Sequence, residues 1–174
     1  MDYLGKEENK RDCAVLFICL GNICRSPAAE GVFKALLEQQ GLSSQVMVDS
    51  AGIGSWHVGE LPDARMRSHA QQRGYVLDSH ARQFHINDFN RFDYIVVMDE
   101  ENYANITRRA HNEEGRQKVI RMADYITRHP GATTVPDPYY GGAEGFELAL
   151  DLIEDGCEGL LKSLSPQREA SFAK

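Results

Sequence analysis

An apolar run that leads directly into a short loop and a proline constrains the fold of this chain most. Residues 14–18 read Ala-Val-Leu-Phe-Ile, and the loop that starts at Cys19 ends at Ser26-Pro27. The run is typical of a buried strand. Ser26 is a favourable N-cap residue and Pro27 suits the first helical position. The segment is therefore predicted to form a strand, a tight loop and a helix.

A loop between a strand and a helix N-terminus favours the binding of an anion. Its backbone N–H groups lack partners within the helix, and the helix dipole adds partial positive charge. Arg25 adds a planar fork that can hold two phosphate oxygens, which lysine cannot do. We expect Cys19, at the start of this loop, to be a thiolate. The pattern indicates attack by Cys19 on phosphorus, followed by hydrolysis of a phosphocysteine.

Asp137 is the best candidate for the acid that protonates the leaving group. It lies between Pro136 and Pro138, which restrict the backbone on both sides. Facing a phosphate dianion, its carboxyl group should retain a proton. A positioned acid of this kind typically contributes about 10²–10⁴ in rate.

Strand and helix patterns alternate along the chain. Further strands are predicted at 46–48, 94–98 and 118–121. Helices are predicted at 26–40, at 62–73, from the end of the strand at 98 to about 110, and at 146–164. This order predicts an α/β fold with a parallel sheet and helices on both faces. Ligands in such folds bind at the carboxyl ends of strands, where Cys19 is predicted to lie.

Four blocks, at residues 19–27, 49–52, 98–100 and 137–140, resemble the low-molecular-weight protein-tyrosine phosphatase family in order and spacing. A cysteine followed by an arginine six positions later would be weak support alone, and the three further blocks make the match specific. The resemblance covers roughly residues 13–164. It implies a three-layer, four-stranded parallel sheet of Rossmann-like, phosphotyrosine phosphatase I type.

The resemblance also implies residue roles. Cys19 would be the nucleophile, Arg25 the clamp for phosphate and the transition state, and Asp137 the general acid and later the general base. The phosphate loop would comprise Leu20, Gly21, Asn22, Ile23, Cys24 and Arg25. Residues that support this loop would be Asn22, Ser26, Ser50 and His80. The substrate cleft would be walled by Ile23, Trp56, Tyr139 and Tyr140.

Composition sets limits on the other function classes. With 174 residues and 42% hydrophobic content, the chain suits one domain over 13–164, with a polar extension at 1–12 and a polar tail at 165–174. The polar start is unlike a signal peptide, and the longest apolar run, residues 13–20, is too short to span a membrane. We therefore expect a cytoplasmic protein that binds no membrane. A net charge of −7 disfavours nucleic acid as a partner.

No metal and no cofactor are expected. Cys19 and Cys24 lack the second ligand pair of a structural zinc site. We hypothesise instead that oxidation joins them reversibly and protects the nucleophile. The histidines outside position 80 show no ligand spacing and are predicted to be surface residues: His57, His69, His85, His111 and His129.

Three alternatives to a tyrosine phosphatase are open at this stage. An arsenate reductase of the same fold needs relay cysteines, and residues 78–93 contain none. A phosphate-binding scaffold would be expected to have lost Cys19, Arg25 or Asp137. A phosphoarginine phosphatase would carry threonine where this chain has Ile23, so Ile23 favours phosphotyrosine. The expected partners are phosphotyrosine-containing proteins, with phosphate or vanadate as small ligands.

Overall fold

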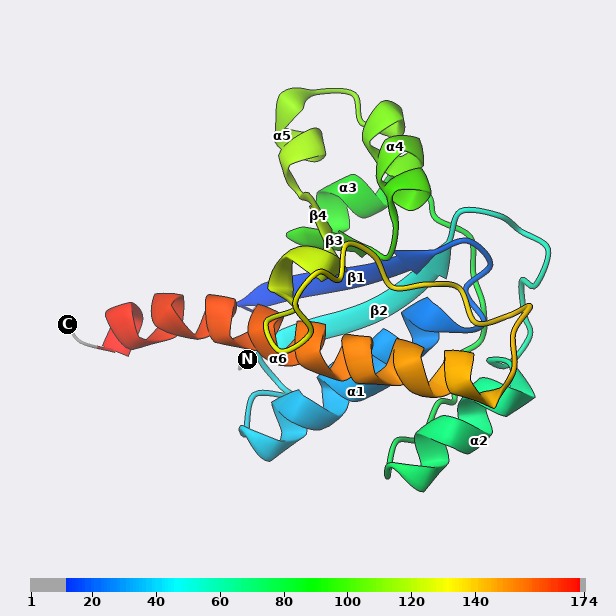
Figure 1. Ribbon diagram of the computed structural model, residues 1–174. Coiled ribbons are helices and arrows are strands. Elements are labelled where there is room, and N and C mark those ends of the chain that lie inside the picture. Colours follow the sequence, from blue (N-terminus) through cyan, green and yellow to red (C-terminus); the bar gives the residue numbers. More distant parts are fainter. Residues whose placement is uncertain (1–11, 173–174) are drawn as a thin grey trace, which may run out of the picture.

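A four-stranded parallel sheet forms the centre of the computed structural model, which describes residues 12–172. The strands lie in the order β2-β1-β3-β4, and all neighbouring pairs are parallel. The predicted α/β fold with a parallel sheet is therefore confirmed (Figure 1). The strand bounds are β1 Cys13–Cys19, β2 Val46–Gly52, β3 Tyr94–Val97 and β4 Val119–Arg121.

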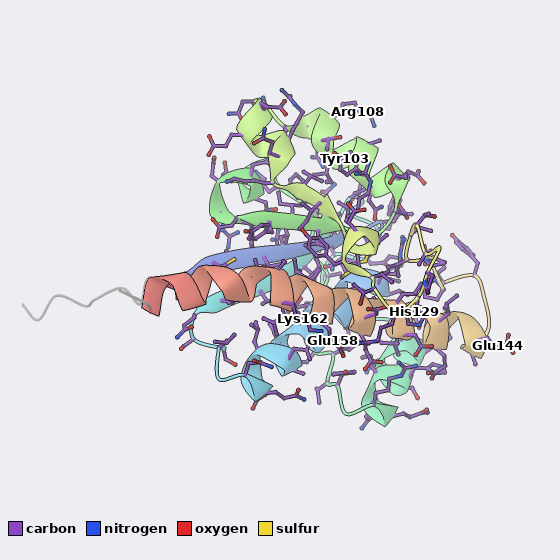
Figure 2. All side chains as sticks on the ribbon, turned by 60° about the vertical axis from the view of Figure 1, so that its left-hand side comes forward. Tyr103, Arg108, His129, Glu144, Glu158 and Lys162 are labelled. Atoms are coloured by element: carbon purple, nitrogen blue, oxygen red, sulfur yellow. The ribbon has the colours of Figure 1, made fainter. Side chains whose placement is uncertain are left out.

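Helices cover both faces of the sheet, so the predicted three layers are confirmed (Figure 1). One face carries α1, α2 and α6, and the other carries α3, α4 and α5. Figure 2 shows this separation: Tyr103 and Arg108 of α4 lie across the sheet from Glu158 and Lys162 of α6. The bounds are α1 Arg25–Gln39, α2 Ala64–Gln72, α3 Asp88–Arg91, α4 Glu100–Arg109, α5 Glu113–Gln117, the 3₁₀ helix η1 Met122–Tyr125 and α6 Ala143–Phe172.

The interior strand β1 joins two apolar cores. Its alternate side chains Val15, Phe17 and Cys19 belong to the core shared with α1 and α6. Leu16 and Ile18 belong to the core on the opposite face. A strand of a parallel sheet is buried on both faces, which explains the continuous apolar run in the sequence. Packing on both sides fixes the end of β1, where Cys19 lies.

Helix α1 begins one residue earlier than predicted. Its N-cap is Cys24, whose side chain makes no capping hydrogen bond, so the prediction that Ser26 caps the helix is wrong. The Ser26 hydroxyl is engaged with Cys19 and Asn22 instead. Pro27 still falls in the first turn, where the helix needs no N–H group. The helix ends as predicted before Gly41, which adopts a φ of +69°.

Other element bounds differ from the predictions for identifiable reasons. Strand β2 runs to Gly52 because it pairs with β1 along its whole length. Helix α2 begins at Ala64 because Asp63 caps it, accepting hydrogen bonds from two backbone N–H groups. Helix α6 continues past the predicted end near residue 164 to Phe172. Most of the predicted extension, residues 1–11, and the last two residues of the predicted tail lie outside the described residues.

Between residues 12 and 172, no helix combines the length and apolar character that crossing a bilayer requires.

Candidate active site

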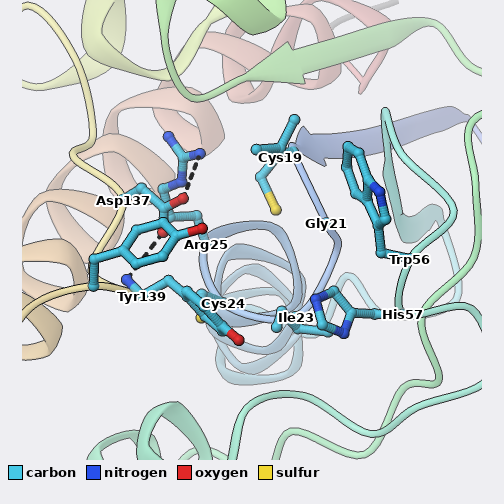
Figure 3. Close-up of a pocket in the computed structure, with 11 residues that line it drawn as sticks. Cys19, Gly21, Ile23, Cys24, Arg25, Trp56, His57, Asp137 and Tyr139 are labelled. Carbon is cyan, nitrogen blue, oxygen red and sulfur yellow. Dashed lines mark hydrogen bonds and ion pairs between the residues drawn. The ribbon is translucent and has the colours of Figure 1, made fainter.

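A cavity of about 310 Å³ opens at the carboxyl end of β1 (Figure 3). It brings together residues from the loop after β1, the loop after β2 and the loop before α6. The lining includes the three predicted catalytic residues and most of the predicted phosphate loop and cleft. The lining residues are Cys19, Leu20, Gly21, Ile23, Cys24, Arg25, Trp56, His57, Asp137, Tyr139 and Tyr140.

The backbone of the loop after β1 is available to an anion. Within residues 12–172, the N–H groups of residues 20–24 donate to no protein acceptor. The helix α1 that follows points its N-terminus at the same place. Unpaired amides at a helix N-terminus form a phosphate-binding site. The geometry therefore supports the anion site that the sequence predicts.

Asn22 holds this loop in shape from behind. Among the described residues it is the only non-glycine with a positive φ, at 57°. Its side-chain amide donates to Ser26 Oγ at 2.7 Å and to Ser50 Oγ at 3.0 Å, and its Oδ1 accepts the Arg82 N–H at 3.0 Å. The Asn22 side chain is not part of the cavity lining. It contributes through the loop backbone, as its predicted supporting role requires.

The supporting network continues from Ser50 to a residue that the sequence analysis did not single out. Ser50 Oγ donates to Glu30 Oε1 at 2.6 Å, and Lys34 Nζ donates to Glu30 Oε2 at 2.6 Å. Glu30 lies on α1 and is 4% exposed. A buried carboxylate needs such partners, because leaving it unpaired would be costly. Its only signal in the sequence is a charged residue on the apolar face of a predicted helix.

His80 does not join the network, so that prediction is wrong. Its side chain is exposed. The backbone N–H of Arg82 bonds to Asn22 instead, and the Arg82 carbonyl accepts the Gly52 N–H at 2.8 Å. This pairing fixes Arg82, rather than His80, beside the loop. A main-chain donor can come from almost any residue type, so the sequence carries no signal for it.

Cys19 is buried, with 3% of its surface exposed. Its Sγ lies 2.9 Å from Ser26 Oγ. Because the Asn22 amide nitrogen can only donate, Ser26 Oγ must accept that bond, and its own O–H remains free to donate to sulfur. A hydroxyl donor stabilises a thiolate and also stabilises sulfur as a leaving group.

Arg25 is a buried cation that carboxylates surround. Nη1 donates to Asp99 Oδ2 at 2.7 Å and to the Val135 carbonyl at 3.0 Å. Nη2 lies 3.7 Å from Asp137 Oδ2. Burial tends to lower the pKa of Arg25, but electrostatic interactions with Cys19, Asp99 and Asp137 and the hydrogen bond to Asp99 outweigh burial and raise the pKa. Arg25 is therefore permanently charged.

Asp137 lies at the mouth of the cavity, with 34% of its side chain exposed. Its Oδ1 accepts the Tyr139 N–H at 3.0 Å. Its loop is anchored on the other side, where the Val135 N–H donates to the Met98 carbonyl at 2.9 Å. The carboxyl group is therefore held next to Arg25 and can still exchange protons with solvent.

Rings wall the mouth of the cavity. Tyr139 and Tyr140 meet edge to face at 4.9 Å between centroids, and Trp56 is 70% exposed. His57 was predicted to be a surface residue, yet it lines the cavity, bonds Glu60 at 2.7 Å through Nδ1 and lies 6.3 Å from the Tyr139 ring. A Cβ on Gly21 would stand 3.1 Å from the His57 ring, so the absence of a side chain at Gly21 allows the ring to lie against the loop.

Two other histidines predicted at the surface are partly buried. His69 Nδ1 lies 2.6 Å from Glu147, and His129 Nδ1 lies 2.8 Å from Asp155. Figure 2 shows His129 beside α6. Between residues 12 and 172, no three histidine, cysteine, aspartate or glutamate side chains are arranged to hold a metal ion.

Cys24 lines the same cavity as Cys19. Burial raises the pKa of the Cys24 thiol, and the nearby charge of Asp63 adds to this effect. Cys24 is therefore a neutral thiol, in keeping with Cys19 as the candidate nucleophile. A reversible Cys19–Cys24 disulfide stays a prediction.

Comparisons with known proteins agree with this geometry. The family model described as low molecular weight phosphotyrosine protein phosphatase matches residues 14–170. A low molecular weight protein-tyrosine-phosphatase from Streptomyces coelicolor is 43% identical over 160 residues, which cover 91% of this chain and 98% of the relative.

Solved structures show the same relationship. A protein tyrosine phosphatase from Entamoeba histolytica, with Hepes in its active site, matches with a TM-score of 0.86 and 44% identity, over 90% of this chain and 99% of the other. The Drosophila arginine phosphatase matches with a TM-score of 0.79 and 35% identity, over 86% of this chain and 96% of the other. The resemblance found in the sequence is confirmed, and the chain belongs to the low molecular weight phosphotyrosine protein phosphatase family.

Proposed function

We propose that this protein hydrolyses phosphotyrosine in proteins through a phosphocysteine on Cys19. The observation that carries the proposal is the convergence of Cys19, Arg25 and Asp137 on one cavity with an aromatic mouth. A nucleophile, a cation and an acid around one anion site are the parts that transfer of a phosphoryl group needs.

The first chemical step would break the bond between phosphorus and the tyrosine oxygen. Cys19 Sγ attacks phosphorus while Arg25 and the loop N–H groups hold the phosphate oxygens. Asp137 donates its proton to the departing oxygen, which leaves as tyrosine. In the second step, water attacks the phosphocysteine and Asp137 accepts a proton from it. The thiolate leaves towards the Ser26 hydroxyl, 2.9 Å away, and inorganic phosphate is released.

The walls of the cavity favour an aromatic substrate. Ile23 presents an apolar side chain that can pack against a ring but cannot accept a hydrogen bond from a guanidinium group. The Tyr139 ring lines the same cavity. Phosphoserine is shorter than phosphotyrosine and has no ring to pack against these walls. Family likeness alone leaves the substrate open, since one relative is named an arginine phosphatase.

The proposed chemistry also bears on location and small ligands. A nucleophilic cysteine must remain a free thiol, and the cytoplasm keeps thiols reduced. We therefore propose a cytoplasmic enzyme. Phosphate and vanadate, as small anions, should occupy the site in place of the substrate.

A substrate panel tests this proposal. Phosphate release is measured without added metal from matched phosphotyrosine, phosphoserine and phosphoarginine peptides, beside an arsenate reduction assay. We expect kcat/KM to be highest for phosphotyrosine and no reduction of arsenate. Faster release from phosphoarginine would contradict the assignment of substrate, and reduction of arsenate would contradict the assignment of reaction.

Cysteine variants test the nucleophile. Cys19→Ser should abolish turnover and still bind vanadate. Cys13→Ser, at the opposite end of β1, is the matched control and should keep full activity. Burial raises the pKa of the Cys13 thiol to about 11, so it is no competing nucleophile. Turnover that survives in Cys19→Ser would refute the phosphocysteine.

A further inference from the structure

Arg65, the second residue of α2, connects the phosphate loop to the loop that carries Asp137. Its Nε and Nη2 donate to the two carboxylate oxygens of Asp63 at 3.1 and 3.0 Å. The same Nη2 donates to the Tyr139 carbonyl at 3.1 Å. Asp63 in turn donates its backbone N–H to the Ile23 carbonyl at 2.8 Å. One guanidinium therefore links the two sides of the cavity.

Asp63 is a firm anchor for this guanidinium. Its side chain is 11% exposed and also accepts the backbone N–H groups of Arg65 at 2.8 Å and Met66 at 3.3 Å. Burial tends to raise the pKa of Asp63, but the bonds from Arg65 and from the helix amides lower it. The carboxylate is therefore charged at neutral pH and offers Arg65 a two-point contact, which fixes orientation as well as position.

Two rings hold the guanidinium plane. Arg65 Cζ lies 5.5 Å from the centre of the Tyr139 ring and 4.8 Å from the centre of the Phe146 ring. Phe146 is 1% exposed, so it is a fixed part of the core. Cation–π contacts at these distances add to the hydrogen bonds. Arg65 is thus held although its side chain is 48% exposed.

The contact with Tyr139 leads directly to the candidate acid. The carbonyl of Tyr139 binds Arg65, and the N–H of the same residue donates to Asp137 Oδ1 at 3.0 Å. Within the described chain, the only other side chain from a distant element with a polar contact to residues 136–140 is Arg25, 3.7 Å from Asp137. Arg25 must share its N–H groups with phosphate. Arg65 is not part of the cavity lining, so its contact can persist when substrate is bound.

We propose that Arg65 is a positioning residue for the general acid. It holds Tyr139, and through Tyr139 it keeps the Asp137 carboxyl at the oxygen of the leaving group. This proposal rests on the proposed function. Without Arg65 the loop around Asp137 would sample other positions, and proton donation in the first chemical step would slow. Attack by sulfur and binding of phosphate would change little.

The test compares two aryl phosphates that differ in their need for a proton. Phenyl phosphate has a poor leaving group, and p-nitrophenyl phosphate has a good one. For Arg65→Met we expect kcat/KM to fall about tenfold with phenyl phosphate and less than about threefold with p-nitrophenyl phosphate. The tenfold loss is a part of the rate factor of about 10²–10⁴ that a positioned acid contributes. Arg67→Met is the matched control on the same helix, because among the described residues the Arg67 side chain hydrogen-bonds only to the Pro62 carbonyl. It should leave both values within about twofold.

A double variant separates positioning from a general loss of structure. If Arg65 acts through Asp137, adding Arg65→Met to Asp137→Asn should lower kcat/KM for phenyl phosphate by less than about twofold. Arg65→Lys keeps one donor for the Tyr139 carbonyl but loses the planar guanidinium fork, so its kcat/KM for phenyl phosphate should lie between those of wild type and Arg65→Met. If Arg65→Met proves unfolded in a thermal melt, Arg65→Lys replaces it in the comparison of the two aryl phosphates.

The outcomes that overturn the proposal are distinct from failure of the phosphatase. Equal slowing of both aryl phosphates, or a full additional loss in the Asp137→Asn background, would refute the positioning role alone. A wild-type protein that releases phosphate from neither compound would refute the phosphatase and the positioning role with it.

Discussion

The close packing of α6 on η1 makes an alanine substitution at Gly159 informative. Alanine normally stabilises a helix interior by about 1 kcal/mol relative to glycine. Here the added Cβ would stand 2.1 Å from the Tyr125 carbonyl oxygen and 3.1 Å from its carbonyl carbon. Both atoms belong to the backbone, so α6 and η1 would have to separate. Overpacking costs about 1–3 kcal/mol, and a backbone clash belongs at the upper end.

We therefore expect Gly159→Ala to lower the free energy of unfolding by about 2 kcal/mol. Gly156→Ala is the matched control, one turn away on the same helix. Its Cβ would meet Met122 Sδ at 2.4 Å and Cγ at 2.9 Å, which belong to a flexible side chain, and the nearest backbone atom, the Met122 carbonyl oxygen, lies further away at 3.3 Å. Gly156→Ala should therefore lower the free energy of unfolding by less than about 1 kcal/mol. Urea unfolding followed by circular dichroism measures both, and the reasoning fails if Gly159→Ala matches or exceeds wild type.

Two further predictions concern the loop before the acid and the wall of the cavity. Burial tends to raise the pKa of Asp155, but bonds from His129 and two backbone N–H groups lower it from 3.8 to about 2. Its side chain is fully buried, so the free energy of unfolding of wild type should exceed that of Asp155→Asn by about 2 kcal/mol at pH 7. This stabilisation is complete above the pKa of the unfolded state and is lost as pH falls towards 2. Urea unfolding should therefore show a difference between wild type and Asp155→Asn that is about 1 kcal/mol smaller at pH 3 than at pH 7. A difference that does not change with pH would contradict this prediction. At Gly54 a Cβ would stand 1.8 Å from the Trp56 ring, which must then leave its place. An aromatic contact contributes about 0.5–1.5 kcal/mol, so Gly54→Ala should raise KM for a phosphotyrosine peptide about two- to tenfold with kcat unchanged. An unaltered KM would show that Trp56 does not contribute to binding of the peptide.

The sequence was sufficient for those parts of the site that depend on local pattern. The run before Cys19 predicts a strand because β1 is buried on both faces. The loop residues between Cys19 and Arg25 are short-range neighbours, so their order alone places them around one anion. Asp137 lies far along the chain, and the prolines on either side and the resemblance to a family made it identifiable.

Other parts depend on contacts that the sequence does not express. Asp99 could be recognised as part of a family block, but its pairing with Arg25 depends on where β3 ends relative to β1. The Arg82 N–H is a main-chain group, and the prediction chose the nearby histidine side chain instead. His57 was assigned to the surface because its contact with Gly21 arises only when two loops meet. In each case the missing information was tertiary placement.

The ion pair between Arg25 and Asp99 also bears on how product leaves. Asp99 is the N-cap of α4 and accepts a hydrogen bond from Arg25. Part of the guanidinium charge is therefore compensated by the protein itself. Inorganic phosphate is held less tightly by a compensated cation than by an isolated one. Asp99 thus moderates the attraction of Arg25 for an anion and favours clearance of the spent phosphate for the next cycle.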